Sequence, residues 1–75
     1  MTRVTYDRQA NAAYIYLNDP ALDNDVAFVY PCDPIKVDGM INLDFAEDGR
    51  LVGVEVLDAR AKLPHYLLDR AEIIG

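Results

Sequence analysis

Apolar and polar residues alternate most regularly in residues 41–57, on both sides of the polar segment 47–50. Such alternation around a glycine-containing turn predicts a β-hairpin. With Asp48-Gly49 as a two-residue loop, the apolar and polar residues fall on opposite sides of the two strands. The facing pairs are then Phe45 with Val52, Leu43 with Val54, Ile41 with Val56, Asn42 with Glu55, and Asp44 with Gly53.

The length of the loop decides the register of this hairpin. A three-residue loop, 47–49, would set Leu43 opposite Gly53 and would move part of the apolar row to the wrong side. The sequence therefore favours the two-residue loop, and Asp-Gly suits the positive φ of a type I′ turn. A four-residue loop, 47–50, keeps the same pairing and stays open.

Residues 3–7 and 12–17 are predicted to form another hairpin, joined by a four-residue loop, because both are rich in β-branched or tyrosine residues. In that register Val4 faces Ile15, Tyr6 faces Ala13, and Leu17 extends the apolar row. Tyr14 and Tyr16 then point to the other side of the sheet. There they are either half exposed or covered by a partner subunit or by the C-terminal segment.

The middle of the chain contains one further strand. Residues 18–25 are rich in Asn, Asp and Pro, which favour turns, and we expect a loop there. Residues 26–30 form the strand, and Pro31 and Pro34 end it because proline has no N–H to donate. Residues 35–37 are either a short strand or an irregular connection.

After residue 57 the alternation gives way to helical spacing. Asp58 is expected to cap a short helical turn, and a further helix over residues 65–71 follows Pro64. An apolar stripe should pack on one face of the sheet: Leu63, Leu67, Leu68 and Ala71. The terminal Ile73-Ile74 either docks across a dimer or frays.

The predicted fold is a single α+β domain, residues 1–75. It has a small antiparallel sheet of four to five strands, connected as hairpins, and a short C-terminal helical segment. A chain of 75 residues buries only about 60% of its unfolded surface, and no pair of cysteines stabilises this one. We therefore expect a homo-oligomer, most simply a dimer.

The net charge of −6 argues against nucleic acid as a partner, since phosphate binding needs a basic surface. It fits a basic protein partner, or it simply keeps the protein soluble. The lone Cys32 fits a reducing cytoplasm. The N-terminus lacks the apolar stretch of a secretory signal, and no apolar run is long enough to span a membrane.

The polar positions of the 41–57 hairpin form the candidate site. If a subunit or loop covers that side, a carboxylate there would have a raised pKa and could act as a general acid or base. The alternative is an ordinary solvated sheet surface. The residues that such a ligand or partner site would use are Asn42, Asp44, Glu55, Tyr14 and Tyr16.

Other catalytic and metal patterns are incomplete. Residues 44–55 nearly match a calcium-binding loop, but Ala46 supplies no oxygen ligand and the flanks alternate like strands. Cys32 and His65 are the single Cys and His of the chain, too few for a zinc site, and no pattern brings them into contact. There is no serine and no glycine-rich phosphate loop. We expect no catalytic residue, no metal and no cofactor.

Two blocks of the sequence are distinctive. They read V-T-Y-D-R-x-A-N-A-A-Y-I-Y-L and M-I-N-L-D-F-A-E-D-G-R-L-V-G-V-E-V-L-D-A, and an L-P pair follows. With these blocks nearly the whole chain resembles a small bacterial family, domain of unknown function 2283. The resemblance implies a short α+β domain with no established activity, and an antitoxin-type role. It also implies acidic residues where this chain has Ala46 and Asn11, so an acidic site is weaker here.

The predicted function is a cytoplasmic, non-enzymatic protein-interaction module that acts as a homodimer. Its docking site would be an exposed sheet edge, either residues 26–30 or the first strand, where backbone groups are unpaired. The alternative is a small-molecule binder or minor enzyme whose acidic site lies between subunits.

Overall fold

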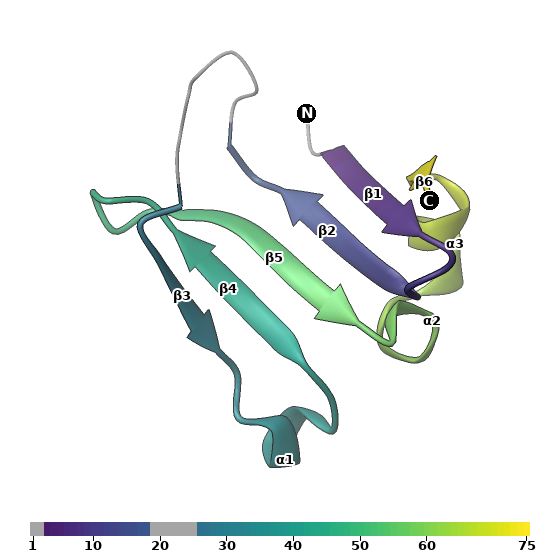
Figure 1. Cartoon of the computed structure of the whole chain (residues 1–75), viewed down its shortest axis with the longest axis horizontal. Coiled ribbons are helices and arrows are strands. Elements are labelled where there is room, and N and C mark those ends of the chain that lie inside the picture. Colours follow the sequence, from purple (N-terminus) through teal and green to yellow (C-terminus); the bar gives the residue numbers. More distant parts are fainter. Residues whose placement is uncertain (1–2, 19–25) are drawn as a thin grey trace.

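The structure, a computed structural model, describes residues 3–18 and 26–75. Six strands form one sheet in the order β3-β4-β5-β2-β1-β6, accompanied by three short helices (Figure 1). The strands are β1 (Arg3–Asp7), β2 (Ala12–Tyr16), β3 (Phe28–Pro31), β4 (Ile41–Phe45), β5 (Leu51–Leu57) and β6 (Glu72–Ile74); the helices are α1 (Pro34–Val37), α2 (Ala59–Lys62) and α3 (His65–Asp69). The α+β class is confirmed, but the sheet is mixed and has six strands instead of four to five. Of the predicted loop over residues 18–25, residues 19–25 lie outside the described residues.

The first hairpin has the predicted register. β1 and β2 are antiparallel, with Val4 opposite Ile15 and Tyr6 opposite Ala13. β2 then pairs with β5 on its other side, and Ile15 lies opposite Val54. The alternation of side chains across three strands therefore continues one apolar row from one hairpin to the other.

The C-terminal residues form a strand that the sequence did not predict. α3 ends at Asp69 rather than near Ala71, and β6 then runs parallel to β1, with Ile73 opposite Tyr6. The three residues of β6 are too few to show a strand periodicity in the sequence. They form a strand because the free backbone edge of β1 supplies their hydrogen-bond partners. β1 is consequently an inner strand, so the proposed docking edge at the first strand is wrong, and β3 is an edge.

The turn of the central hairpin also differs from the predicted one. Gly49 N–H donates to Ala46 O (3.0 Å), Ala46 N–H donates to Arg50 O (2.9 Å), and Gly49 has a φ of 88°. These features define a three-residue loop, 47–49, that ends on a left-handed glycine. The two-residue loop is therefore wrong, and so is the four-residue alternative.

A β-bulge restores the predicted register beyond this loop. Phe45 lies opposite Leu51 rather than Val52, and the ladder shifts by one residue so that Asp44 faces Gly53. The remaining pairs are those predicted: Leu43 with Val54, Asn42 with Glu55, and Ile41 with Val56. One extra residue in β5 is a smaller cost than a whole apolar row on the wrong side of the sheet.

Residues 35–37 are helical, which neither of the two predicted alternatives allowed. They belong to α1, whose N-cap Asp33 accepts from the backbone N–H of Ile35 (2.9 Å) and Lys36 (3.4 Å). Pro34 fits the first turn because its missing N–H has no intrahelical partner there. A strong local cap therefore makes one turn of helix where the sequence pattern was ambiguous.

Asn11, rather than Asp58, caps α2. Asp58 precedes the helix, but it has a φ of 52° and its side chain makes no capping hydrogen bond. The Asn11 Oδ1 accepts from Arg60 N–H (3.1 Å) and from the Tyr6 hydroxyl (3.0 Å). Its Nδ2 donates to Asp58 Oδ1 (3.0 Å), and its carbonyl accepts from Ala59 N–H (2.9 Å). The turn between β1 and β2 thus holds the start of α2.

The core lies where α2 and α3 cover one end of the sheet. Its buried cluster consists of Tyr6, Ala13, Ala59 and Leu68, and Leu63 and Ala71 pack against it. The predicted stripe therefore does pack on the sheet, chiefly through Leu68. Among the described residues the largest fully buried side chain is Val56, which shows how small this core is. The rest of the same side of the sheet carries no helix in the described part of the chain.

Candidate functional site

The polar side of the sheet contains all five predicted site residues. Tyr14 on β2 donates its hydroxyl hydrogen to Asp44 Oδ2 on β4, at 2.5 Å, across the intervening strand β5. The phenol crosses β5 at Gly53, where a Cβ would lie 2.5 Å from the Tyr14 Cζ. Gly53 is therefore required for this contact, and Asp44 is only 8% exposed beneath it.

The Tyr14 phenol is held in its protonated form. Burial raises its pKa well above the ordinary value, and the hydrogen bond to the Asp44 carboxylate raises it further. A phenol with a raised pKa is a donor at neutral pH and not a base or nucleophile. Its role in this geometry is to satisfy the Asp44 carboxylate.

The remaining predicted residues continue this network along the sheet. Asn42 Nδ2 donates to Glu55 Oε1 at 2.9 Å, and the two residues are directly paired across β4 and β5. The rings of Tyr14 and Tyr16 are 4.6 Å apart, and the Arg3 guanidinium lies 4.8 Å from the centre of the Tyr16 ring. The structure thus brings the five residues together as a hydrogen-bonded and stacked surface. Their role as a ligand site stays a prediction.

Replacing Tyr14 by phenylalanine tests this network. We expect the free energy of unfolding to fall by about 2 kcal/mol at neutral pH, because buried Asp44 loses its donor. Because the pKa is raised in the folded state, the hydroxyl contributes its full stabilisation below about pH 10, the pKa of tyrosine in the unfolded chain. This stabilisation is lost as the pH rises from there through the higher pKa of the folded state. Urea titrations should therefore show the difference between wild type and variant shrinking only above about pH 10.

The control for this experiment is Tyr66→Phe, since Tyr66 is 65% exposed on α3. It should leave the stability unchanged at every pH. A Tyr14→Phe difference that stays constant to about pH 11 would contradict the assignment of the raised pKa to this hydrogen bond.

The other candidate groups lie apart. Cys32 precedes α1 and His65 begins α3, elements at different ends of the sheet (Figure 1). In the loop that resembles a calcium site, Asp48 accepts from the Arg50 backbone N–H at 3.0 Å. Within residues 3–18 and 26–75, no group of three or more His, Cys, Asp or Glu side chains is placed to hold a metal ion.

The apolar side of the sheet was missed as a site. Two cross-strand rows lie beyond the helices on this side, and we call them the open face: Phe28, Phe45 and Leu51 in one row, and Tyr30, Leu43, Val54, Ile15 and Val4 in the other. Phe28 is 52% exposed and Tyr30 is 60% exposed. A signal for it existed, since the alternating strands supply far more apolar positions than two helices of four and five residues can cover.

The comparison with known families agrees with the sequence resemblance. The family described as "Protein of unknown function (DUF2283)" matches residues 3–60. The chain belongs to this family. The DUF2283 match spans β1 to β5 and the first residues of α2, so it includes the polar network and the open face.

Similarity beyond the family was not found. No curated protein and no solved structure is significantly similar to this DUF2283 chain. No helix in the described part of the chain combines the length and the apolar character needed to cross a membrane.

Proposed function

We propose that this protein is a cytoplasmic, non-enzymatic interaction module that works as a homodimer, with a second copy packed on the open face. The observation that carries the proposal is an uncharged apolar face left uncovered by α2 and α3. Two such sheets would pack face to face about 10 Å apart and bury both copies of Phe28 and Tyr30. The lone Cys32 supports the cytoplasmic location.

The area of the open face is sufficient for a specific dimer. A covered aromatic side chain buries about 150–250 Å², so the half-exposed Phe28 and Tyr30 still expose about 100 Å² each. With the six other residues, the patch reaches about 500 Å², the size of a functional patch on a monomer. Two copies would bury about 1,000 Å², which is near the lower limit for a specific interface.

The charge distribution favours a second copy over another partner. Two chains with a net charge of −6 repel each other unless their contact surfaces are uncharged. The open face contains no charged residue, while the carboxylates of Asp44 and Glu55 lie on the other side of the sheet. A basic partner would find nothing complementary on the open face.

The edge of the sheet offers less than its face. Cys32 N–H donates to Ile41 O, so in the antiparallel ladder Phe28 and Tyr30 direct their backbone groups toward β4. Within β3 this leaves Val29 as the residue whose N–H points outward, because Pro31 has none. An edge with one outward donor supports little strand addition, so we favour the face.

Sedimentation or light scattering of Tyr30→Asp tests the proposal. The wild-type chain should have about twice the 8.4 kDa mass of one chain at tens of micromolar, and Tyr30→Asp should have the mass of a monomer. The reason is that a carboxylate on each copy would be buried without a partner in the contact. Because Tyr30 is 60% exposed, the variant should keep the fold of the single chain.

Tyr66→Asp is the matched control, since Tyr66 is 65% exposed on α3 and lies outside the open face. It should leave the dimer intact. A wild-type chain that is monomeric at about 100 µM would refute the proposal, and so would equal masses for the two variants.

The homodimer would leave the polar side of the sheet, which carries Glu55, accessible for the basic protein partner that the net charge of −6 allows. An antitoxin-type role would use this surface. Co-expression with the product of a neighbouring gene, followed by copurification at low and high salt, tests that part separately. A complex that forms with Tyr30→Asp as well as with wild type would show that the two surfaces act independently.

A further inference from the structure

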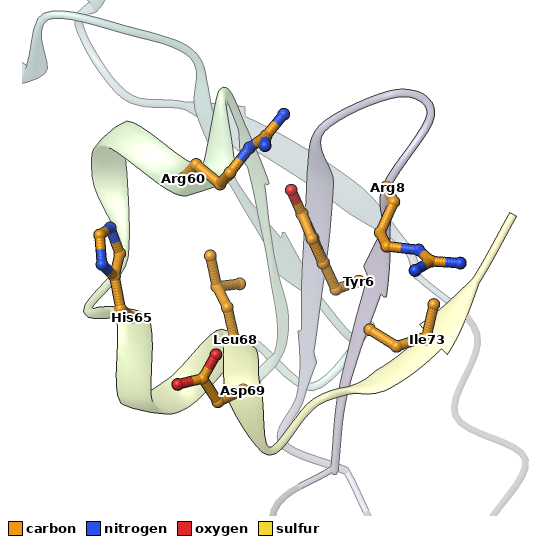
Figure 2. A pocket seen from close by; sticks show the side chains of 7 residues that line it. All are labelled: Tyr6, Arg8, Arg60, His65, Leu68, Asp69 and Ile73. Atoms are coloured by element: carbon orange, nitrogen blue, oxygen red, sulfur yellow. The ribbon is translucent and has the colours of Figure 1, made fainter.

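A cavity of about 490 Å³ lies on the helical side of the sheet, between β1, α2, α3 and β6 (Figure 2). Its volume is in the range of sites that hold small molecules. Tyr6 and Leu68, which are 6% and 7% exposed, form its floor, and Ile73 of β6 adds a partly exposed apolar wall. The cavity is distinct from the open face, because it lies at the end of the sheet that α2 and α3 cover. It is also distinct from the Tyr14–Asp44 network, which lies on the other side of the sheet.

Positive charge is concentrated at one end of this cavity. The chain has seven Lys and Arg against thirteen Asp and Glu, yet Arg8 and Arg60 both line the cavity. Figure 2 shows them on either side of the Tyr6 side chain. Neither makes an ion pair with a residue in the described ranges, whereas Arg3 is paired with Glu72. A guanidinium donates charged hydrogen bonds to carboxylate or phosphate oxygens, so these two side chains favour an anion at this end of the cavity.

The other end of the cavity has a different chemistry. Asp69 and His65, both on α3, line it (Figure 2). The Asp69 carboxylate repels an anion at this end and therefore orients a single negative charge toward Arg8 and Arg60. The apolar floor lies between the two ends, so a bound anion would place an apolar body over Leu68.

We propose that this cavity binds a small monoanion, a carboxylate carried on an apolar body, with the charge held by Arg8 and Arg60. The Tyr6 hydroxyl donates to Asn11 Oδ1 at 3.0 Å, so it is fixed as an acceptor for the neutral part of the ligand. α3 and β6 supply four of the lining residues, which gives the C-terminal strand a function in addition to pairing. This site is independent of the dimer proposed above.

Amide chemical shifts of the ¹⁵N-labelled full chain test the site, with benzoate as the probe. Benzoate should shift the amides of Arg8, Arg60, Leu68 and Ile73 with a dissociation constant on the order of 1 mM. Benzamide, its neutral analogue, should bind about tenfold more weakly, because the charged hydrogen bonds are lost. Inorganic phosphate should also bind about tenfold more weakly than benzoate, since it lacks the apolar body.

Substitutions then test whether Arg8 and Arg60 hold the carboxylate of benzoate. Arg8→Gln and Arg60→Gln should each weaken benzoate about tenfold, and both side chains are exposed, so the fold should persist. Arg50→Gln is the matched control in the distant hairpin turn, where the Arg50 side chain is 84% exposed, and it should bind like wild type. The proposal is overturned if benzoate shifts no cavity amide at about 20 mM, if benzamide or phosphate binds as tightly, or if Arg50→Gln weakens binding as much as Arg8→Gln.

Discussion

Gly53→Ala is expected to lower the free energy of unfolding by about 3 kcal/mol, an unusually large effect for adding one methyl group to a strand. The new Cβ would lie 2.7 Å from the Tyr14 Cε1, far inside ordinary contact distance. The phenol cannot move without cost, because its hydroxyl is bonded to Asp44 and its ring packs on Tyr16. Overpacking and an unpaired buried carboxylate each cost about 1–3 kcal/mol.

Urea denaturation at one fixed protein concentration measures this effect, since a dimer makes apparent stability depend on concentration. The decisive comparison is the same substitution in a Tyr14→Ala background. There the clash is absent, and Gly53→Ala should be neutral or slightly stabilising, because alanine restricts the unfolded chain more than glycine does. An equal loss in both backgrounds would show that Tyr14 is not the reason for the glycine.

Asn11→Ala should lower the free energy of unfolding by nearly as much, about 3 kcal/mol. Alanine at a φ of 51° costs about 1–2 kcal/mol, which asparagine tolerates better. The Tyr6 hydroxyl loses its acceptor, and the backbone N–H of Arg60 loses its cap, which is worth about 1 kcal/mol. The same urea titration measures the total.

Two further variants separate these contributions. Asn11→Gly removes the backbone strain but also the side chain, so it should lose only about half as much as Asn11→Ala. Asn11→Asp keeps both acceptor contacts but places a carboxylate next to Asp58, so its loss should also be smaller than that of alanine and should shrink with added salt. If glycine is as destabilising as alanine, the positive φ has no measurable energetic role.

Local patterns were enough to predict both hairpins. The pairing of Val4 with Ile15 and of Leu43 with Val54 follows from period-2 alternation, because each register was chosen to keep one apolar row together. The same criterion led to the wrong loop at Asp48-Gly49. A bulge in β5 lets a three-residue loop and the correct register coexist, and the alternation of residues does not indicate it.

The sequence predicted which residues form the candidate site, but it did not predict how they contact one another. Pairing rules placed Asn42 opposite Glu55 and left Gly53 beside Asp44, and the structure has both. No local rule indicates that Tyr14 reaches Asp44 across β5, since the two residues are 30 positions apart and are not direct neighbours in the sheet. That contact depends on a tyrosine of the right length crossing a strand at a glycine.

By itself, then, the sequence determined the α+β class, the strands of both hairpins and, away from the bulge at Leu51, the side of the sheet on which the residues of these strands lie. These depend on neighbouring residues along the chain, whose spacing is set by backbone geometry. The tertiary structure alone decided the parallel pairing of β6, the capping of α2 by Asn11, the position of α2 and α3 beside the open face and the cavity lined by Arg8 and Arg60. Each of these requires segments far apart in the chain to meet, and which ones meet depends on the packing of the whole domain.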